Sequence, residues 1–235
     1  MNKYLILLIS GIFILAGCAT STRSGEVDEK IWANYEEPLR SLGDPTEDAV
    51  QNVMREAAEK EDWLGAVPKL QKIIDDGIAE HEFAEDSIMR TEIDRCIFKC
   101  MIIARKYDEA LKFAERLPYV QEELAEGKNF KRESSIVILE SGTFAKYGLK
   151  GKGMSKMDAY LKRSDIPTED RQRVTYVRAL ASLLPPGDPE KFIKRLEETR
   201  DVDPESKIGK LAAEMAEEAK AKLEDLKKGE KQQTE

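Results

Sequence analysis

A pair of apolar stripes constrains the fold of this chain more than any other feature. The first stripe consists of Ile93, Cys96, Ile97, Cys100 and Ala104. The second follows after Arg105 and Lys106 and consists of Tyr107, Ala110, Leu111, Ala114 and Leu117. Spacings of three and four place each stripe on one face of a helix. Two such helices joined by a turn of two or three residues form an antiparallel hairpin, which cannot bury both of its faces without neighbours.

The pattern of the second stripe occurs once more, 44 residues upstream, as Trp63-x2-Ala66-Val67-x2-Leu70-x2-Ile73. An aromatic residue, two further residues, Ala, an aliphatic residue and then small or apolar residues every third or fourth place resemble the turn and second helix of a tetratricopeptide repeat. The Pro that follows Leu117 adds to the resemblance. The resemblance implies an all-α fold, a tetratricopeptide-like α-solenoid of stacked helical hairpins. Pro68 departs from the family pattern and predicts a kink or a late start in its helix.

Helical periodicity predicts hairpin units near residues 46–76, 88–117, 134–163 and 168–201, after a first helix at 29–42. The run Ile136 to Leu139 would suit a strand by β-branching, but no strand partner is present and a buried helix is favoured. A break is expected from Gly148 to Gly153, with the answering helix beginning at Met154. A non-repetitive helical bundle is the alternative to the solenoid.

The longest predicted helix begins after Asp203-Pro204-Glu205 and ends near Lys228. Its apolar stripe is narrow and its other faces are charged, as in a helix that caps the last hairpin of a repeat array. A coiled-coil arm is the alternative for this helix. We expect residues 229–235 to form a disordered tail, so that the helical-repeat domain spans residues 29–228.

The amino terminus indicates a cellular address. Residues 1–17 have the features of a signal peptide, and their apolar run is shorter than the ~20 residues that a spanning helix needs. Leu15-Ala16-Gly17-Cys18 matches the lipobox of bacterial lipoproteins. The resemblance implies cleavage before Cys18, a diacylglycerol on its sulfur and an acyl chain such as palmitate on its new amino end. An ordinary secretory signal with a chance Cys is the alternative.

The residue after the predicted lipidation site suggests which membrane carries the anchor. In the enterobacterial family pattern an Asp at this position retains a lipoprotein in the inner membrane, and here the position is Ala19. We therefore predict a protein of the bacterial cell envelope, held in the outer membrane through Cys18 and facing the periplasm. Residues 18–28 lack apolar periodicity, which indicates a flexible tether behind the lipidated Cys.

The residue content argues against several function classes. The formal net charge of −8 disfavours nucleic-acid binding, which needs a basic face. His81 is the only histidine, and it lies in an acidic stretch that reads as an inter-helix loop rather than a catalytic or metal site. Cys96 and Cys100 stand four apart on one face and read as buried core thiols. We therefore predict no catalytic residues, no metal and no cofactor.

The most unequal charge lies between Lys128 and Arg163. Its cations suggest a basic patch that docks lipid headgroups, a polysaccharide or an acidic protein, although a solvated face is the alternative. The residues of this predicted basic patch are Lys146, Lys150, Lys152, Lys156, Lys162 and Arg163.

Two functions follow from these patterns. The first is a non-catalytic, lipid-anchored scaffold that binds a protein or peptide partner during outer-membrane or envelope assembly or export. The second is an envelope glycan-binding module or a carboxylate-dependent hydrolase, which would need two carboxylates placed across a cleft. A deep pocket with two facing carboxylates of raised pKa would favour the second function.

Overall fold

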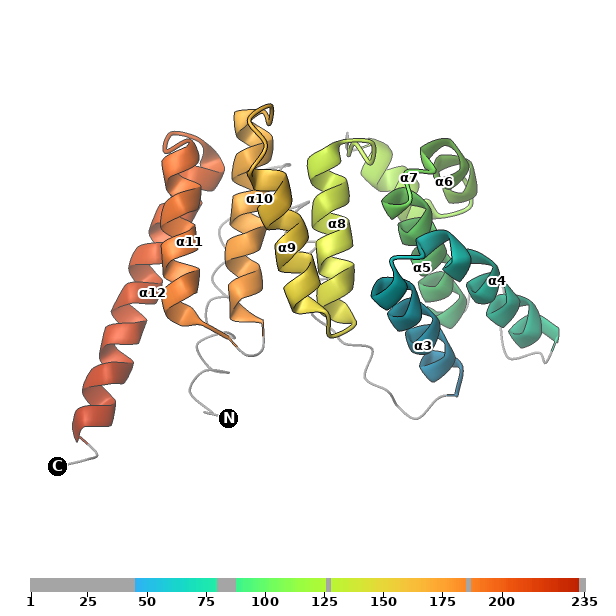
Figure 1. The fold of residues 1–235 in the computed structure, drawn as a ribbon, viewed down its shortest axis with the longest axis horizontal. Helices are drawn as coiled ribbons and strands as arrows, with labels where there is room; N and C mark the ends of the chain where they lie inside the picture. Colours follow the sequence, from blue (N-terminus) through green and yellow to red (C-terminus); the bar gives the residue numbers. More distant parts are fainter. Residues whose placement is uncertain (1–44, 80–87, 126–127, 185–186, 233–235) are drawn as a thin grey trace. The chain divides into compact units, whose positions relative to one another are not determined.

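The structure is a computed structural model that describes residues 45–79, 88–125, 128–184 and 187–232 (Figure 1). Within these residues the chain is all-α, with ten α-helices, one short 3-10 helix and no strand. The predicted signal peptide, lipobox, tether and first helix lie outside the described residues, as does His81. The chain divides into two compact units, and the division falls between Lys156 and Met157.

The N-terminal unit, described here from residue 45 to residue 156, consists of three helical hairpins and one additional helix. Its first hairpin is α3 (Pro45–Lys60) and α4 (Trp63–Ala79), and its second is α5 (Ile88–Ile103) and α6 (Tyr107–Ala114). The short helix α7 (Pro118–Ala125) leads to the third hairpin, α8 (Glu133–Lys146) and α9 (Lys150–Leu161), whose second helix runs past the division. Helix α8 covers the β-branched run at 136–139, so the prediction of a helix there is confirmed.

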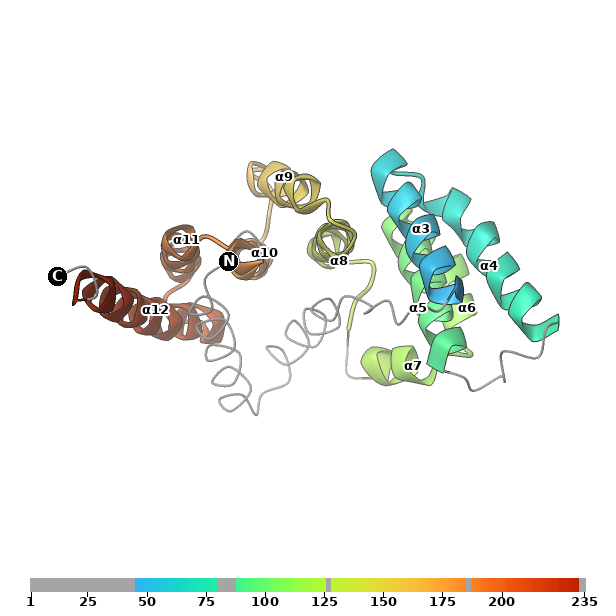
Figure 2. The same cartoon turned by 90° about the horizontal axis from the view of Figure 1, so that it is seen from below.

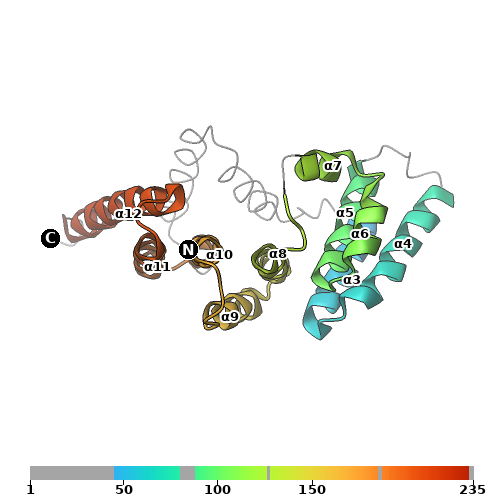
Figure 3. The same ribbon diagram turned by 90° about the horizontal axis from the view of Figure 1, so that it is seen from above.

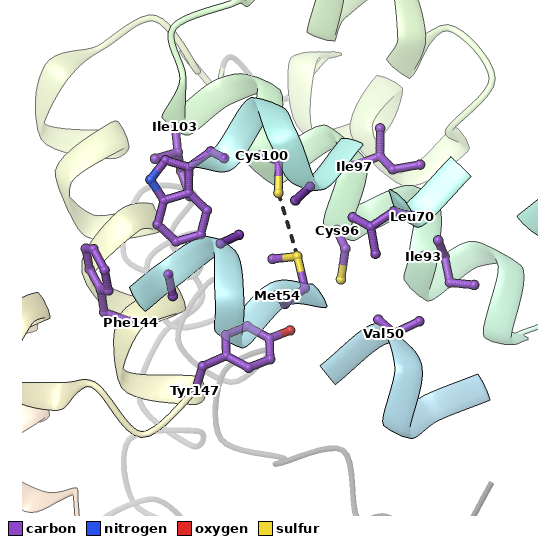
Figure 4. Close-up of a cluster of buried hydrophobic side chains, with 14 of the residues drawn as sticks. Val50, Met54, Leu70, Ile93, Cys96, Ile97, Cys100, Ile103, Phe144 and Tyr147 are labelled. Atoms are coloured by element: carbon purple, nitrogen blue, oxygen red, sulfur yellow. Dashed lines mark hydrogen bonds between the residues drawn. The ribbon is translucent and has the colours of Figure 1, made fainter. Parts of the chain in front are cut away.

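Helix α5 is the centre of this unit, because it is buried on two sides. Its predicted stripe, including Ile93, Ile97 and Cys100, packs into a core with α3, α4 and α8 (Figure 4). Its other side places Phe98 and Ile102 in a second core with α6 and α7. Figure 3 shows α5 next to α4 and α6. The hairpin whose apolar stripes most constrain the fold is therefore the one around which the unit is built.

The three hairpins close with the same kind of turn. Two residues before α4, α6 and α9 begin, the backbone takes a positive φ, at Glu61 (55°), Arg105 (61°) and Gly148 (82°). In each turn the following N–H donates a hydrogen bond to the carbonyl oxygen five residues earlier, over 3.0, 2.9 and 2.8 Å in chain order. This left-handed helix ending satisfies carbonyls that the helix would otherwise leave unpaired.

A small residue follows each turn at the same distance. Ala66, Ala110 and Gly153 are buried and lie five residues after the positive-φ position. At Gly153 a Cβ atom would come within 2.5 Å of the Ser141 carbonyl oxygen, so α8 and α9 approach more closely than an alanine would allow. The predicted repeat of an aromatic residue, two residues and Ala is thus one version of a spacing that three hairpins share.

Three sequence predictions are corrected. Helix α4 begins at Trp63, despite Pro68, because the Asp62 carboxylate accepts a hydrogen bond from the Gly65 N–H (3.0 Å) and caps the helix. The break predicted for residues 148–153 ends at Leu149, since the turn at Gly148 is complete there and the glycines that follow are helical. The last helix continues to Gln232, past its predicted end near Lys228.

The C-terminal unit contains the end of α9, then α10 (Thr168–Leu180), the 3-10 helix η1 (Ala181–Leu183), α11 (Pro189–Val202) and α12 (Lys207–Gln232). Figure 2 shows α11 beside α10 and α12, and these pairs make the principal contacts of the unit. Helix α11 is capped by Asp188, whose carboxylate accepts a hydrogen bond from the Lys191 N–H (2.9 Å). The cap of α12 is Ser206 rather than Asp203, because the Ser206 hydroxyl accepts from the Gly209 N–H (2.9 Å).

A buried glutamine of α10, Gln172, makes hydrogen bonds to the turn between α11 and α12. The Gln172 amide donates to the carbonyl oxygens of Thr199 (3.3 Å) and Asp203 (2.8 Å), and its oxygen accepts from the Ser206 hydroxyl (2.7 Å). Because these groups are shielded from water, each hydrogen bond satisfies a polar atom that would otherwise be costly to bury. Among the described helices, none combines the length and the apolar character that crossing a membrane requires.

Candidate functional site

The predicted basic patch does not form one surface within a single unit. Lys146 ends α8, while Lys150, Lys152 and Lys156 lie in the part of α9 that belongs to the N-terminal unit. Lys162 and Arg163 belong to the C-terminal unit. Arg163 makes a bidentate pair with Asp165 (3.0 and 2.8 Å).

Two of the predicted lysines bind the end of α3. The Lys152 ammonium donates to the Glu59 carbonyl oxygen (2.7 Å) and lies 3.8 Å from the Glu61 carboxylate. The Lys156 ammonium pairs with Glu61 (2.7 Å) and with Glu140 (3.2 Å). We call Lys152, Lys156, Glu61 and Glu140 the lysine clasp. A cation at the carboxyl end of a helix also meets the negative end of the helix dipole.

The lysine clasp lies against aromatic residues of the core. The ammonium groups of Lys152 and Lys156 are 5.7 and 5.8 Å from the centre of the Phe144 ring. Phe144 is fully buried and packs edge to face with Trp63, with ring centres 5.5 Å apart. Cation–aromatic contacts of this length are attractive. The two lysines therefore hold the α3–α4 turn to α8 and α9.

The protonation states strengthen this ionic contact. The hydrogen bond from Lys156 lowers the pKa of the Glu61 carboxyl. Burial acts to lower the pKa of Lys156, but its hydrogen bonds with Glu61 and Glu140 prevail, so its pKa is raised. Both groups are therefore charged at neutral pH. Two lysines that the sequence assigned to a docking patch therefore join helices within the N-terminal unit.

A small, shallow hollow on the α3–α4 hairpin is lined by two carboxylates, Glu56 and Asp62. Glu56 accepts hydrogen bonds from Lys60 (2.7 Å) and Lys69 (2.6 Å). These two lysines lower the pKa of Glu56 to about 2, so it is ionised and cannot donate a proton at neutral pH.

The two predicted core thiols are buried and free (Figure 4). Cys100 lies 3.6 Å from the Met54 sulfur, and both cysteines belong to the core around α5. Burial raises the pKa of each thiol, which keeps it protonated and unreactive. Within the described part of the chain, no group of three or more His, Cys, Asp and Glu residues is arranged to hold a metal ion.

Sequence reasoning missed a second charged cluster, at the junction of α5, α6 and α7. The Arg116 side chain, between α6 and α7, lies 3.3 Å from the Asp94 carboxylate of α5 and 3.9 Å from the centre of the Phe113 ring. The neighbouring Arg95 lies 4.5 Å from the centre of the Tyr119 ring. We call Asp94 with Arg90 and Arg116, together with the neighbouring Arg95, the arginine surface.

The acids of α5 that pair with these arginines, Glu92 and Asp94, differ in exposure. The Asp94 side chain is only 8% exposed. Arg90, four residues earlier in α5, lies 3.8 Å from the Asp94 carboxylate. Burial raises the pKa of Asp94 and outweighs the two arginines, which act to lower it. Glu92 pairs with Arg95. The sequence held no signal for this cluster, because Arg116 is far from Asp94 along the chain and contacts it only through packing.

Comparison with protein-family models, with curated proteins and with solved structures finds no match for this chain. The function must therefore be argued from the fold and from these two charged clusters.

Proposed function

We propose that this protein is a lipid-anchored scaffold of tetratricopeptide-like hairpins. It faces the periplasm and holds a protein or peptide partner in outer-membrane or envelope assembly or export. Its anchor is Cys18, and its lipobox is the sequence feature that supports this location. Stacked helical hairpins expose long side faces to a partner, and such arrays bind other proteins through these faces.

The observation that carries the proposal is the repeated hairpin turn of the N-terminal unit. Positive φ at Glu61, Arg105 and Gly148, each followed by a small buried residue, marks three hairpins built on one plan. A chain that repeats one plan at intervals of 44 and 43 residues has the organisation of a helical array. Helix α12, with its charged outer faces, is the capping helix of this proposal.

The enzyme alternative has less support. A glycoside hydrolase places an acid of raised pKa opposite an ionised carboxylate. Glu56, the carboxylate in the hollow on α3 and α4, has a lowered pKa. Asp94 has a raised pKa, but arginines flank it rather than a second open carboxylate. Among the residues that the structure describes, no specific contact therefore favours the alternative.

The anchor is tested by expressing the full chain and its Cys18→Ala variant in a Gram-negative host. Mass spectrometry of the detergent-extracted protein should show loss of residues 1–17 and the added mass of acyl chains in the wild type. The Cys18→Ala variant should lack the acyl mass and leave the membrane fraction. A wild-type protein that keeps residues 1–17 and carries no acyl mass contradicts the anchor.

The scaffold role is tested by crosslinking in intact cells, followed by purification of the protein and identification of the captured partners. The expected result is a defined partner of the envelope that the wild type captures and the soluble Cys18→Ala variant does not. Recovery of the lone protein under these conditions contradicts the scaffold.

A further inference from the structure

We propose that the first two turns of α9, residues 150–156, form a strap that opens away from α3 and α8, and that the lysine clasp keeps this strap closed. Because the clasp is made of exposed ion pairs, the ionic strength of the solution sets how often the strap opens. The movement takes place within the N-terminal unit. It goes beyond the proposed scaffold and does not depend on the identity of a partner.

The strap has little apolar packing of its own. Among residues 150–156, Gly153 is the one buried residue, and it has no side chain to pack. Gly151 and Gly153 also lower the helix propensity of these two turns. Helix α8 beside the strap is different, because its Phe144 is fully buried. Since local opening starts in elements with few buried apolar contacts, the strap should open while α8 stays packed.

Polar contacts of the lysine clasp hold the strap in place of apolar packing. The Lys156 ammonium pairs with Glu61 (2.7 Å) and with Glu140 (3.2 Å), and Lys152 donates to the Glu59 carbonyl oxygen (2.7 Å). The side chains of Lys156 and Glu61 are 36% and 43% exposed, so dissolved salt screens their attraction. The contact that closes the strap is therefore also the contact that salt weakens.

The backbone at Glu61 indicates that its side chain has a specific use. Its φ of 55° lies in the left-handed region that favours glycine, and the equivalent position of the third hairpin is Gly148. A glutamate at this position costs stability, but its carboxylate reaches Lys156 of the strap. Arg105 has the same backbone conformation in the second hairpin, and it pairs with Glu133 of α8 (2.6 Å) rather than with the strap.

The closed strap covers a polar atom that has no partner. The Ser141 side chain is buried, and its hydroxyl makes no hydrogen bond with any described residue. Ser141 lies against the strap, because a Cβ atom at Gly153 would come within 3.2 Å of the Ser141 Cα. A buried hydroxyl without a partner costs free energy, and contact with water removes this cost. Opening of the strap therefore recovers part of what the broken ion pairs lose.

The experiment is hydrogen–deuterium exchange of the full chain in detergent micelles, read by mass spectrometry at low and at high salt. We expect the amides of the strap to exchange roughly threefold to tenfold faster at high salt, the change that loss of a small ion-pair network gives. The amides of α5 in the same unit should keep their rates. Because the opening is local, low concentrations of urea should hardly change exchange in the strap. Equal strap exchange at low and at high salt overturns the proposal.

Glu61→Gly is the decisive variant, because it relieves the left-handed backbone and removes the carboxylate of the clasp at once. Its urea midpoint should not fall, while exchange in the strap should rise about fivefold and lose most of its salt dependence. A simple loss of stability would lower the midpoint as well. Strap exchange at the wild-type rate in Glu61→Gly overturns the proposal. If circular dichroism shows that this variant has lost its helices, Lys156→Gln decides the question by the same readout.

Arg105→Gly is the matched control, because it makes the same backbone change at the second turn and removes an ion pair that does not involve the strap. It should leave exchange in the strap unchanged, and an acceleration equal to that of Glu61→Gly overturns the clasp as the cause. Gly151→Ala tests the opposite direction, since no atom lies within 4 Å of the added Cβ and alanine favours the helix. It should slow exchange in the strap about twofold to fivefold, and faster exchange in this variant overturns the proposed opening.

Discussion

The lysine clasp and the arginine surface both place one acid between two cations, yet the two acids respond in opposite ways. Glu61 of the clasp is 43% exposed, and the hydrogen bond from Lys156 lowers its pKa. Asp94 of the arginine surface is 8% exposed, and burial raises its pKa although Arg90 and Arg116 oppose the shift. Nearby cations lower the pKa of a carboxyl group only when their attraction exceeds the cost of removing the carboxylate from water.

The two clusters also hold their cations in different ways. The clasp lysines donate to backbone carbonyls and glutamates of their own unit. The arginines of the other cluster stack on aromatic rings, so part of each guanidinium still faces the solvent. A run of cations in the sequence therefore located a contact within the N-terminal unit, at Lys152 and Lys156.

The largest expected loss of stability comes from removing the aromatic ring beneath one of the two clusters. Phe144→Ala should lower the free energy of unfolding of the N-terminal unit by about 3–5 kcal/mol, because Phe144 is fully buried against Trp63. Phe113→Ala, beneath the half-exposed Arg116, should cost about 1 kcal/mol. Urea unfolding followed by Trp63 fluorescence in a Trp32→Phe background measures both. Equal losses would show that the clasp is no more deeply packed than the arginine surface.

A second comparison uses two glycines of α9 that lie two residues apart. Gly153→Ala should destabilise by about 1–3 kcal/mol, since its Cβ would lie 2.5 Å from the Ser141 carbonyl oxygen. Gly151→Ala has no atom within 4 Å and should stabilise the helix by about 0.5–1 kcal/mol. Thermal and urea unfolding of both variants measure whether each substitution lowers or raises the stability. A stable Gly153→Ala variant would mean that α8 and α9 do not approach each other closely.

The pKa of Asp94 predicts a stability that falls as pH rises. A raised pKa means that the folded state holds the proton more tightly than the unfolded state, whose pKa is about 4. The stability of the wild type relative to Asp94→Asn should therefore decrease between acidic and neutral pH. Urea midpoints measured across this range test the sign. An increase would show that the arginines outweigh burial.

The lowered pKa of Glu61 predicts a stability that rises with pH, and the smallest change in the free energy of unfolding. Its lowered pKa gives stability that is complete above the unfolded pKa of about 4.3 and is lost as pH falls through the folded pKa. Because the pair is well exposed, the advantage of the wild type over Glu61→Gln should stay below about 1 kcal/mol and shrink with added salt. A difference that does not change with pH would exclude the ion pair with Lys156 as its source.

Much of the fold could be predicted from the spacing of apolar residues. The stripe from Ile93 to Cys100 is buried, and the helices of the hairpins lie close to their predicted ranges. The errors were local. Pro68 predicted a kink or a late start, and the late start is wrong, because the Asp62 cap three residues before Gly65 starts the helix at Trp63. The glycines at 151 and 153 were read as a break, although close packing on Ser141 requires the second of them.

The sequence alone determined the all-α class and the hairpin order, because helical periodicity and caps are local properties of the chain. It also carries Leu15-Ala16-Gly17-Cys18, whose match to a lipobox needs no fold to be seen and stays a prediction. Tertiary structure decided which charges are available. Whether Lys156 meets Glu61, or Arg116 meets Asp94 and Phe113, depends on residues that are distant along the chain and become neighbours only when the hairpins pack.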